Sequence, residues 1–340
     1  MYDGTVERAR GVPSSEVLLE ERCRGGRAQR RVIVIAGPTA SGKSRLAMEI
    51  ATLLPGEIIS ADSVQVYSRM DIGSAKPTPE ERERVPHHLI DIREITEGPF
   101  NVTDFHKEAV LAIRSVLQRG RTPIVVGGTG YYLHALVYGP PGGPPRSLRV
   151  RRELEEDLKK FGPEALYERL RAYDPSYART IGLRDRQKIV RALEIIATTG
   201  ERVSHLSGSG EGKVSKEFDF RCWFIYFPKE ILYPRIEMRC DEMLSQGFIE
   251  EVETLRDSLR QNGAAAHAIG YRRCLDFLET DRTDEEWEKF VWEFKKDSRR
   301  YAKRQFTWFR REPLFRWIDL DVYGYERALD LIVRDYESRY

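Results

Sequence analysis

Cysteine is scarce in this sequence of 340 residues, and its four cysteines show no pairing pattern. Their positions lack the C-x-x-C spacing of a zinc site or a redox pair, and no histidine has a third metal ligand in recognisable spacing. The sequence therefore argues against a disulfide scaffold and a zinc site, and it favours free thiols in a reducing compartment. The cysteines are Cys23, Cys222, Cys240 and Cys274.

Long apolar stretches are missing as well. No run approaches the ~20 residues that a membrane-spanning helix needs. The first 30 residues are rich in arginine, but they contain Glu16, Glu20 and Glu21 and lack the apolar segment of a secretory signal. We therefore expect a cytoplasmic, monomeric protein without a membrane partner, in which residues 1–30 are a disordered extension or the result of a misassigned start.

A strong net charge is also absent, because 56 lysines and arginines face 54 acidic residues and leave +2. Taken alone, this balance argues weakly against a nucleic-acid partner, but the placement of charge matters more than its sum. The basic residues gather in three clusters, and the last contains no acid. They are Arg146, Arg149, Arg151 and Arg152; Arg184, Arg186, Lys188 and Arg191; and Arg299, Arg300, Lys303, Arg304, Arg310 and Arg311.

What the sequence does contain is a phosphate-binding motif. Residues 37–44 fit G-x-x-x-x-G-K-[ST], follow the apolar run Val32–Ile35 and precede an amphipathic helix start. In this setting backbone N–H groups and the helix N-terminus attract an anion, Lys43 adds a full charge, and the Ser44 hydroxyl can ligate Mg²⁺. The motif predicts a phosphate ligand without saying which molecule carries it. Its members are Gly37, Pro38, Thr39, Ala40, Ser41, Gly42, Lys43 and Ser44.

The first part of the chain alternates strand-like and helix-like segments. Such alternation predicts a parallel sheet covered by helices, and hence an α/β protein. We expect strands at 32–36, 57–60 and 123–126, and helices at 44–54 and 102–118.

A tract rich in glycine and proline, residues 139–145, ends this alternation. Helical patterns follow at 148–161, 163–172 and 186–198, and a strand at 221–227 returns to the sheet. We therefore expect a core of residues 31–145 and 216–325, interrupted by an all-helical insertion at 146–215. Long helices are predicted near 229–261 and 284–311.

Asp62 is a candidate general base. It directly follows the apolar strand at 57–61, and ligands in open α/β sheets bind beyond the carboxyl ends of the strands. Its carboxylate should therefore face the phosphate loop, where it could accept a proton from an incoming nucleophile. The alternative is an aspartate that caps a turn together with Ser63.

Glycines follow the strand at 123–126, where a typical nucleotide hydrolase places a magnesium-binding aspartate. Gly127, Gly128 and Gly130 would let a backbone or a ligand approach closely, and Thr129 offers a hydroxyl group to a phosphate or a base. The missing aspartate weakens an ATPase interpretation but does not exclude a small-molecule kinase.

Two arginine patterns suggest contacts with anions. Arg235 and Arg239 share a helix face and could grip a leaving diphosphate, or they could lie on a solvated surface. In the helix ending at Arg311, basic residues occupy one side and apolar residues the other. A solubilising face usually includes acids, so we favour contact between this basic side and a polyanion.

Together, several motifs resemble one family, the tRNA dimethylallyltransferases (tRNA isopentenyltransferases) of bacterial type. The resemblance covers nearly everything from about residue 31 to residue 316. Ser74 and Ser298 stand where relatives often have threonine, and the zinc finger of eukaryotic relatives has no counterpart. Beside the phosphate loop, the matching segments are 59–67, 70–77, 86–91, 126–132, 191–194, 270–272 and 302–308.

The resemblance implies a P-loop NTPase-like core with an all-helical insertion, and it implies a reaction. Dimethylallyl diphosphate would donate its dimethylallyl group to N6 of adenosine 37, in tRNAs that read codons beginning with U, and release diphosphate. Asp62 would take the N6 proton, and Thr129 would position the reacting groups. The phosphate loop with Lys43, Arg239 and Mg²⁺ on Ser44 would hold the diphosphate. This reaction transfers no phosphoryl group, so it does not need the magnesium-binding aspartate that nucleotide hydrolases place after the strand at 123–126.

The same resemblance implies a tRNA partner, bound through its anticodon stem-loop. The family's contacts fall on the phosphate-loop side, on the insertion and on the basic helix. They correspond to Asp62, Ser63, Val64, Gln65, Thr129, Arg149, Gln187, Lys188, Arg191, His267, Gly270, Tyr271, Arg272, Lys303 and Arg304.

Three other functions stay open at this point. An adenylate isopentenyltransferase acting on free AMP would not need the basic helix. A small-molecule P-loop kinase would use Asp62 to activate a hydroxyl group, but it leaves the arginine-rich insertion unexplained. An RNA-binding regulator with a vestigial loop fits poorly with intact Lys43 and Ser44.

Overall fold

A parallel sheet of six strands forms the centre of the computed structural model, which describes residues 30–144, 146–206 and 214–338. The order is β3-β2-β4-β1-β5-β6, so the chain is an α/β protein with a P-loop NTPase-like core, as predicted. The bounds are β1 Arg31–Ala36, β2 Gly56–Ser60, β3 His87–His88, β4 Thr122–Gly127, β5 Asp219–Tyr226 and β6 Arg316–Asp319.

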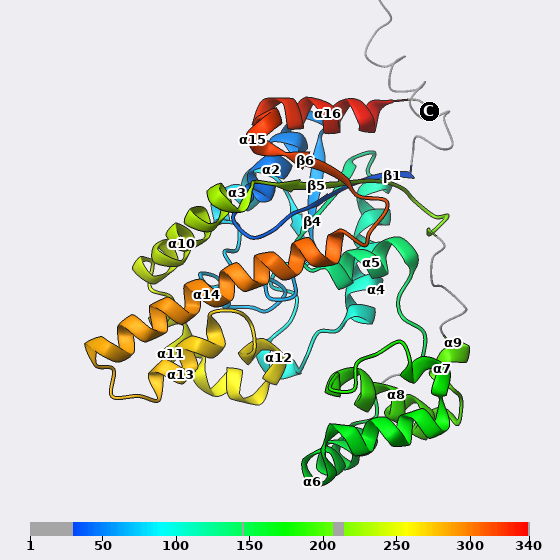
Figure 1. Ribbon diagram of the computed structural model, residues 1–340. Helices are drawn as coiled ribbons and strands as arrows, with labels where there is room; N and C mark the ends of the chain where they lie inside the picture. The colour runs from blue at the N-terminus through cyan, green and yellow to red at the C-terminus, as the bar shows by residue number, and fades with distance from the viewer. Residues whose placement is uncertain (1–29, 145, 207–213, 339–340) are drawn as a thin grey trace, which may run out of the picture. The chain divides into compact units, whose positions relative to one another are not determined.

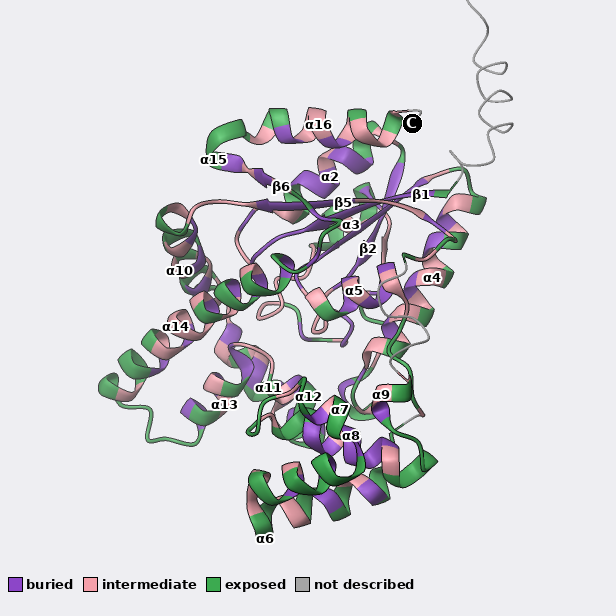
Figure 2. Ribbon diagram, turned by 45° about the vertical axis from the view of Figure 1, so that its right-hand side comes forward, coloured by how far each residue is buried: buried purple, intermediate pink, exposed green. Residues whose placement is uncertain are grey.

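The inner strands are apolar on both sides because helices cover both faces of the sheet. On one face, Ile33 and Ile35 pack in a cluster with residues of α2 (Lys43–Leu53) and α16 (Tyr325–Glu337). On the other face, the ring of Phe224 lies 4.9 Å from that of Phe309 on α14 (Asp284–Phe309). Figure 1 shows α16 and α14 on opposite sides of the sheet, and Figure 2 shows how thoroughly the strands are buried.

The described chain divides into two compact units. The first contains the described residues of 1–100, 108–130 and 216–340, and the second contains residues 101–107 and the described residues of 131–215. The boundary therefore falls at Tyr131, before the glycine- and proline-rich tract where we expected it, and the first unit continues past residue 325 through α16.

Helices make up the elements of the second unit that the structure describes. A buried cluster that includes Leu154, Leu170 and Ile189 packs the longer ones together, and Gly162 (φ 81°) kinks α6 where two helices were predicted. The helices are α5 Gly130–Tyr138, α6 Leu148–Tyr173, α7 Pro175–Ala178, α8 Arg186–Thr199 and α9 Val203–Leu206, with the start of α4 Val102–Gln118.

The remaining helices belong to the first unit. The continuous helix predicted near 229–261 is wrong: Gly247, in the left-handed region at φ 95°, separates two helices there. None of the described helices combines the length and the apolarity that crossing a bilayer requires. The bounds are α3 Pro79–Arg84, the 3₁₀ helix η2 Ile95–Glu97, α10 Lys229–Ser245, α11 Phe248–Gln261, α12 Gly263–Ala266, α13 Tyr271–Leu278 and α15 Leu320–Tyr323.

Candidate active site

The phosphate loop lies between β1 and α2, as its motif predicts. Gly42 adopts φ 85° and caps α2 without a side-chain hydrogen bond. The N–H groups of the first helical turn have no acceptor within a helix, so they are available to an anion. Position 37 requires glycine because the backbone of β5 lies close to it: a Cβ there would be 2.5 Å from the Ile225 carbonyl oxygen.

A cavity of about 630 Å³ opens beside this loop, and all of its lining residues belong to the first unit. The ends of β2 and β4 form its floor, together with the segment 73–77. Its polar lining includes Lys43, Ser44, Asp62 and Arg239. Its apolar lining comes largely from α10 and α14, and includes Ile236, Cys240, Met243 and Phe294. Both the volume and the mixed lining are typical of a small-molecule site.

Lys43 and Arg239 both interact electrostatically with Asp62 in this cavity. Burial and the nearby Arg239 charge lower the pKa of Lys43 to about 8, while Asp62 opposes this shift. Burial also lowers the pKa of Arg239, again opposed by Asp62. Lys43 donates one hydrogen bond to the Pro38 carbonyl oxygen (3.3 Å), and Arg239 forms no ion pair or hydrogen bond within the described chain. The site therefore has an excess of positive charge, which an anion would neutralise.

Asp62 caps a turn, as one of the two interpretations predicted, and its side chain also lines the cavity. Its Oδ1 accepts hydrogen bonds from the backbone N–H groups of Val64 (2.8 Å) and Gln65 (3.4 Å), which is a turn cap. Its Oδ2 has no hydrogen-bond partner among the described residues, and the side chain lines the cavity. One oxygen thus fixes the carboxylate, and the other is available for chemistry.

Thr129 lies next to this carboxylate. Its Oγ1 accepts a hydrogen bond from the backbone N–H of Ser63 (3.2 Å), and its side chain is hydrogen-bonded to Tyr301. Burial and the Asp62 charge raise the pKa of the Tyr301 phenol, so this group remains protonated. Tyr301 lines the cavity, whereas the sequence pattern placed it only on the packed side of its helix.

The arginine pair on α10 divides into two roles. Arg239 lines the cavity, as required for a diphosphate ligand. Arg235 instead lies over the ring of Phe227 and donates a hydrogen bond to the Ala40 carbonyl oxygen (3.0 Å). Arg235 therefore contacts the phosphate loop and does not line the cavity, whereas the sequence pattern left open a diphosphate grip by both arginines or a solvated face.

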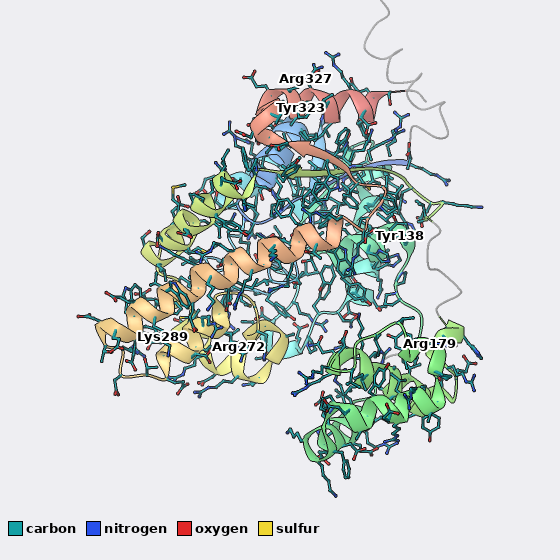
Figure 3. All side chains as sticks on the ribbon, in the orientation of Figure 1. Tyr138, Arg179, Arg272, Lys289, Tyr323 and Arg327 are labelled. Carbon is teal, nitrogen blue, oxygen red and sulfur yellow. The ribbon has the colours of Figure 1, made fainter. Side chains whose placement is uncertain are left out.

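The expected RNA contacts in the first unit fall into exposed and internal residues. His267 lines the cavity and Arg272 is exposed on α13 (Figure 3). Gln65 is occupied within the protein, because its amide accepts from Ser60 Oγ (2.8 Å) and donates to the carbonyl oxygens of Ser74 and Ala75 (both 3.2 Å).

Tyr271 is a correction to those expectations. Its side chain is 0% exposed and has no surface to offer to RNA. The ring packs against Phe248, and the neighbouring Gly270 (φ 87°) is itself enclosed by Phe294 and Phe248. Residues 270 and 271 therefore shape the wall of the site from inside.

Glu251 is a positioning residue that the sequence did not reveal. Its carboxylate accepts hydrogen bonds from the backbone N–H groups of Asp71 (2.8 Å), Ile72 (2.6 Å) and Gly73 (3.2 Å), and from the Tyr271 hydroxyl group (2.6 Å). This single acid thus anchors the segment that enters the cavity wall. Its three backbone partners are 178–180 residues away in the chain, so no local sequence pattern indicates them.

In the second unit, the residues predicted to contact RNA differ in how far their side chains are already engaged within the protein. Gln187 is exposed, Arg149 is exposed and paired with Glu153 (2.8 Å), and Lys188 is paired with Asp185 (3.3 Å). Arg191 is tied to the fully buried Glu194 (3.2 Å) and to the Pro144 carbonyl oxygen (2.6 Å), which gives it a structural role.

The basic side of α14 is exposed where RNA contact was predicted. Lys303, Arg304, Arg310 and Arg311 are exposed, and none is ion-paired within the part of the chain that the structure describes. The start of the cluster differs, because Arg299 pairs with Glu237 and Arg300 with Asp297. Lys303 and Arg304 lie on α14, and Arg310 and Arg311 follow directly after its last residue; we define these unpaired four as the α14 basic face.

Metal-binding clusters are absent from the described residues, where no three His, Cys, Asp or Glu side chains come together. Cys222, Cys240 and Cys274 are free and buried, and Cys23 lies outside the described residues. The predicted magnesium position at Ser44 needs no such cluster, since the Ser44 hydroxyl lines the cavity beside Lys43 and the diphosphate itself would supply further oxygen ligands.

Comparison with known proteins decides the family. The family description IPP transferase matches residues 65–312. The tRNA dimethylallyltransferase of Protochlamydia amoebophila (strain UWE25) is 56% identical over 311 residues, which cover 91% of this chain and 90% of the relative. That of Chlamydia pneumoniae is 42% identical over 309 residues, with coverage of 91% and 90%. This chain belongs to the IPP transferase family.

Solved structures agree with this assignment. The full-length tRNA isopentenylpyrophosphate transferase from Bacillus halodurans matches with a TM-score of 0.65 and 36% identity, over 91% of this chain and 97% of that one. A eukaryotic dimethylallyltransferase acting on tRNA matches with a TM-score of 0.77 and 29% identity, over 92% of this chain and 80% of that one.

Lys43 should give anion binding by this IPP transferase a distinctive pH dependence. Below pH 8 the amine is already charged; above it, binding of inorganic diphosphate must take up a proton, because a bound anion favours the charged form. Calorimetric affinity should therefore fall, by up to about tenfold per pH unit, as the pH rises from 8 to about 9.5.

Lys43→Arg is the matched control, since a guanidinium stays charged throughout this range. The titration of the diphosphate itself is common to both proteins, so the ratio of their affinities isolates Lys43. A ratio that stays constant through pH 8 would contradict the lowered pKa.

Proposed function

We propose that this chain transfers the dimethylallyl group of dimethylallyl diphosphate to N6 of adenosine 37 in tRNAs that read codons beginning with U. One observation carries the proposal: the phosphate loop with Lys43, the Arg239 guanidinium and the Asp62 carboxylate, which has one oxygen without a hydrogen bond, line the same cavity. The names of the relatives, which are tRNA dimethylallyltransferases, support it.

The diphosphate would lie on the phosphate loop, against Lys43 and Arg239. Ser44 offers a hydroxyl oxygen, the donor type that Mg²⁺ prefers, and would hold this ion, which adds positive charge beside the diphosphate. The prenyl tail would lie along the apolar lining near Met243 and Phe294. Positive charge fixed around the leaving group stabilises the transition state more than the ground state, because negative charge grows on the departing oxygen.

Bond making and breaking then balance without a further reactant. The N6 lone pair of the extruded adenine forms a bond with C1 of the prenyl group, and the C1–O bond breaks with its electron pair going to diphosphate. The N6 proton passes to the free oxygen of Asp62, which its turn cap holds in place. Thr129, positioned by Ser63 and Tyr301, orients the acceptor.

Acceptor choice tests the function directly. The protein is incubated with dimethylallyl diphosphate and unmodified tRNA, with dimethylallyl diphosphate and AMP, or with ATP and small hydroxyl acceptors. We expect diphosphate release and N6-dimethylallyladenosine only with tRNA. Prenylation of AMP would instead identify an adenylate isopentenyltransferase, and ADP formation would identify a kinase.

Asp62→Asn separates the base from the turn cap. Asparagine keeps an oxygen for the Val64 and Gln65 N–H groups but cannot accept the N6 proton, so turnover should fall by about 10²–10⁴-fold. The affinity for tRNA, measured by filter binding, should stay within about twofold because the loop is preserved. Near-normal turnover would remove Asp62 as the base.

The α14 basic face should bind the phosphate backbone of tRNA. Lys303→Ala should weaken tRNA binding and reduce the slope of log affinity against log salt concentration by about 1, because one phosphate contact releases about one counterion. Lys289→Ala, on the exposed first half of the same helix (Figure 3), is the control and should change neither quantity. Equal slopes for Lys303→Ala and the unmodified protein would exclude this contact.

A further inference from the structure

Three side chains of α14 contact three consecutive residues after β4. Tyr301 is hydrogen-bonded to Thr129, Gln305 to Gly128, and the Trp308 indole lies against Gly130. Positions 301, 305 and 308 are four and seven residues apart, so they lie on one helix face. The glycines that the sequence marked as sites of close approach therefore admit this protein's own helix.

Gln305 is the centre of this contact. Its Nε2 donates to the Gly128 carbonyl oxygen (3.0 Å), and its Oε1 accepts from the Thr39 backbone N–H (3.1 Å). The residue is only 4% exposed. One planar amide thus links the end of β4 to the phosphate loop. Gly128 is 177 residues and Thr39 is 266 residues away from Gln305 in the sequence.

The fit at Gly128 is tight for a steric reason. A Cβ at this position would lie 2.1 Å from Gln305 Nε2, and the other atoms near it, Gln305 Cδ and the Gly37 carbonyl oxygen, would be at 3.4 Å. Gly128 does not need a left-handed backbone, because its φ lies outside that region. The glycine is therefore required by the amide of Gln305 and not by the turn.

The two loops that Gln305 links have separate tasks under the proposed function, on which this inference rests. The phosphate loop holds the leaving diphosphate, and the segment after β4 carries Thr129 beside Asp62, where the adenine N6 would lie. Reaction requires the attacking and attacked atoms to approach within about 3–3.5 Å. A displacement of one loop relative to the other would change this separation directly.

We propose that Gln305 is a positioning residue, which fixes the phosphate loop relative to Asp62 and Thr129 and thereby sets the approach of the two substrates. Gln305 lines the cavity, but both polar atoms of its amide are engaged by the two loops. One buried and one partly buried hydrogen bond from the same side chain resist separation of the loops, and losing them leaves the Gly128 carbonyl oxygen and the Thr39 N–H without these partners. The α14 basic face belongs to the same region, so bound tRNA would contact the helix that Gln305 connects to the phosphate loop.

The test uses Gln305→Met, which keeps the length of the side chain and removes both hydrogen bonds. Single-turnover rates are measured with enzyme in excess and both substrates saturating. We expect the rate constant for transfer to fall by about tenfold or more, with the reaction amplitude and the tRNA affinity unchanged. A merely structural role would lower the amplitude, which counts folded enzyme, and leave the rate constant alone.

Phe290→Leu is the matched control on the same helix. Phe290 is 4% exposed and packs against Phe277 and Phe294, away from the phosphate loop. This substitution should lower the melting temperature without slowing the rate constant. If it slows transfer as much as Gln305→Met does, general loosening of α14 explains the effect and the proposal is overturned.

A double-mutant cycle tests the contact itself. Gly128→Ala alone should slow transfer, because the added Cβ displaces the Gln305 amide. In a Gln305→Ala background the same change should cost little, since the atom it would strike is gone. Fully additive losses would contradict a joint action of these residues.

Binding of inorganic diphosphate, measured by calorimetry, keeps the two proposals distinguishable. It needs no acceptor, and we expect Gln305→Met to weaken it about fivefold or more, because the freed loop must be ordered again on binding. If the unmodified protein binds diphosphate but transfers nothing to tRNA, the proposed function fails. Weaker diphosphate binding by Gln305→Met would still support the positioning role of Gln305. If Gln305→Met has the same rate constant for transfer and the same affinity for diphosphate as the unmodified protein, the positioning role of Gln305 is refuted and the proposed function is unaffected.

Discussion

The electrostatic imbalance around Asp62 is the interaction on which this site depends. Lys43 and Arg239 are both withdrawn from water beside one carboxylate, and burial lowers the pKa of each. Such a group of charges is costly until an anion enters, since desolvated cations need partners. An anionic ligand would thus offset the free energy that folding spends on withdrawing Lys43 and Arg239 from water.

Local sequence patterns predicted the parts of the site that local structure creates. The phosphate loop, the position of Asp62 after β2 and the exposed basic face of α14 each follow from a motif, a strand end or a helical period. The helix break at Gly247 was missed because a lone glycine inside a charged helical pattern is compatible with either outcome. Family resemblance added the substrate, which no spacing of residues contains.

Long-range partners were beyond such reasoning. Nothing near Glu251 indicates that it accepts hydrogen bonds from residues 71–73, and nothing near Gln305 indicates that it joins Thr39 to Gly128. Arg191 and Arg235 make contacts of the same hidden kind, since each donates a hydrogen bond to a backbone carbonyl oxygen that no charge pattern reveals. A sequence displays which groups are available, whereas the tertiary fold decides which of them are already occupied.

The anchoring of residues 71–73 by Glu251 has a consequence for sequence tolerance. The carboxylate holds this segment through backbone N–H groups alone, so the side chains of residues 71 and 72 contribute nothing to this anchor. Those two positions can therefore be exchanged for almost any residue as far as this attachment is concerned. Gly73 has no such freedom, because a Cβ there would meet Phe248 at 2.3 Å and Tyr271 at 2.6 Å. Substitutions at positions 71 and 72 thus leave this attachment intact, whereas position 73 is fixed by steric contact.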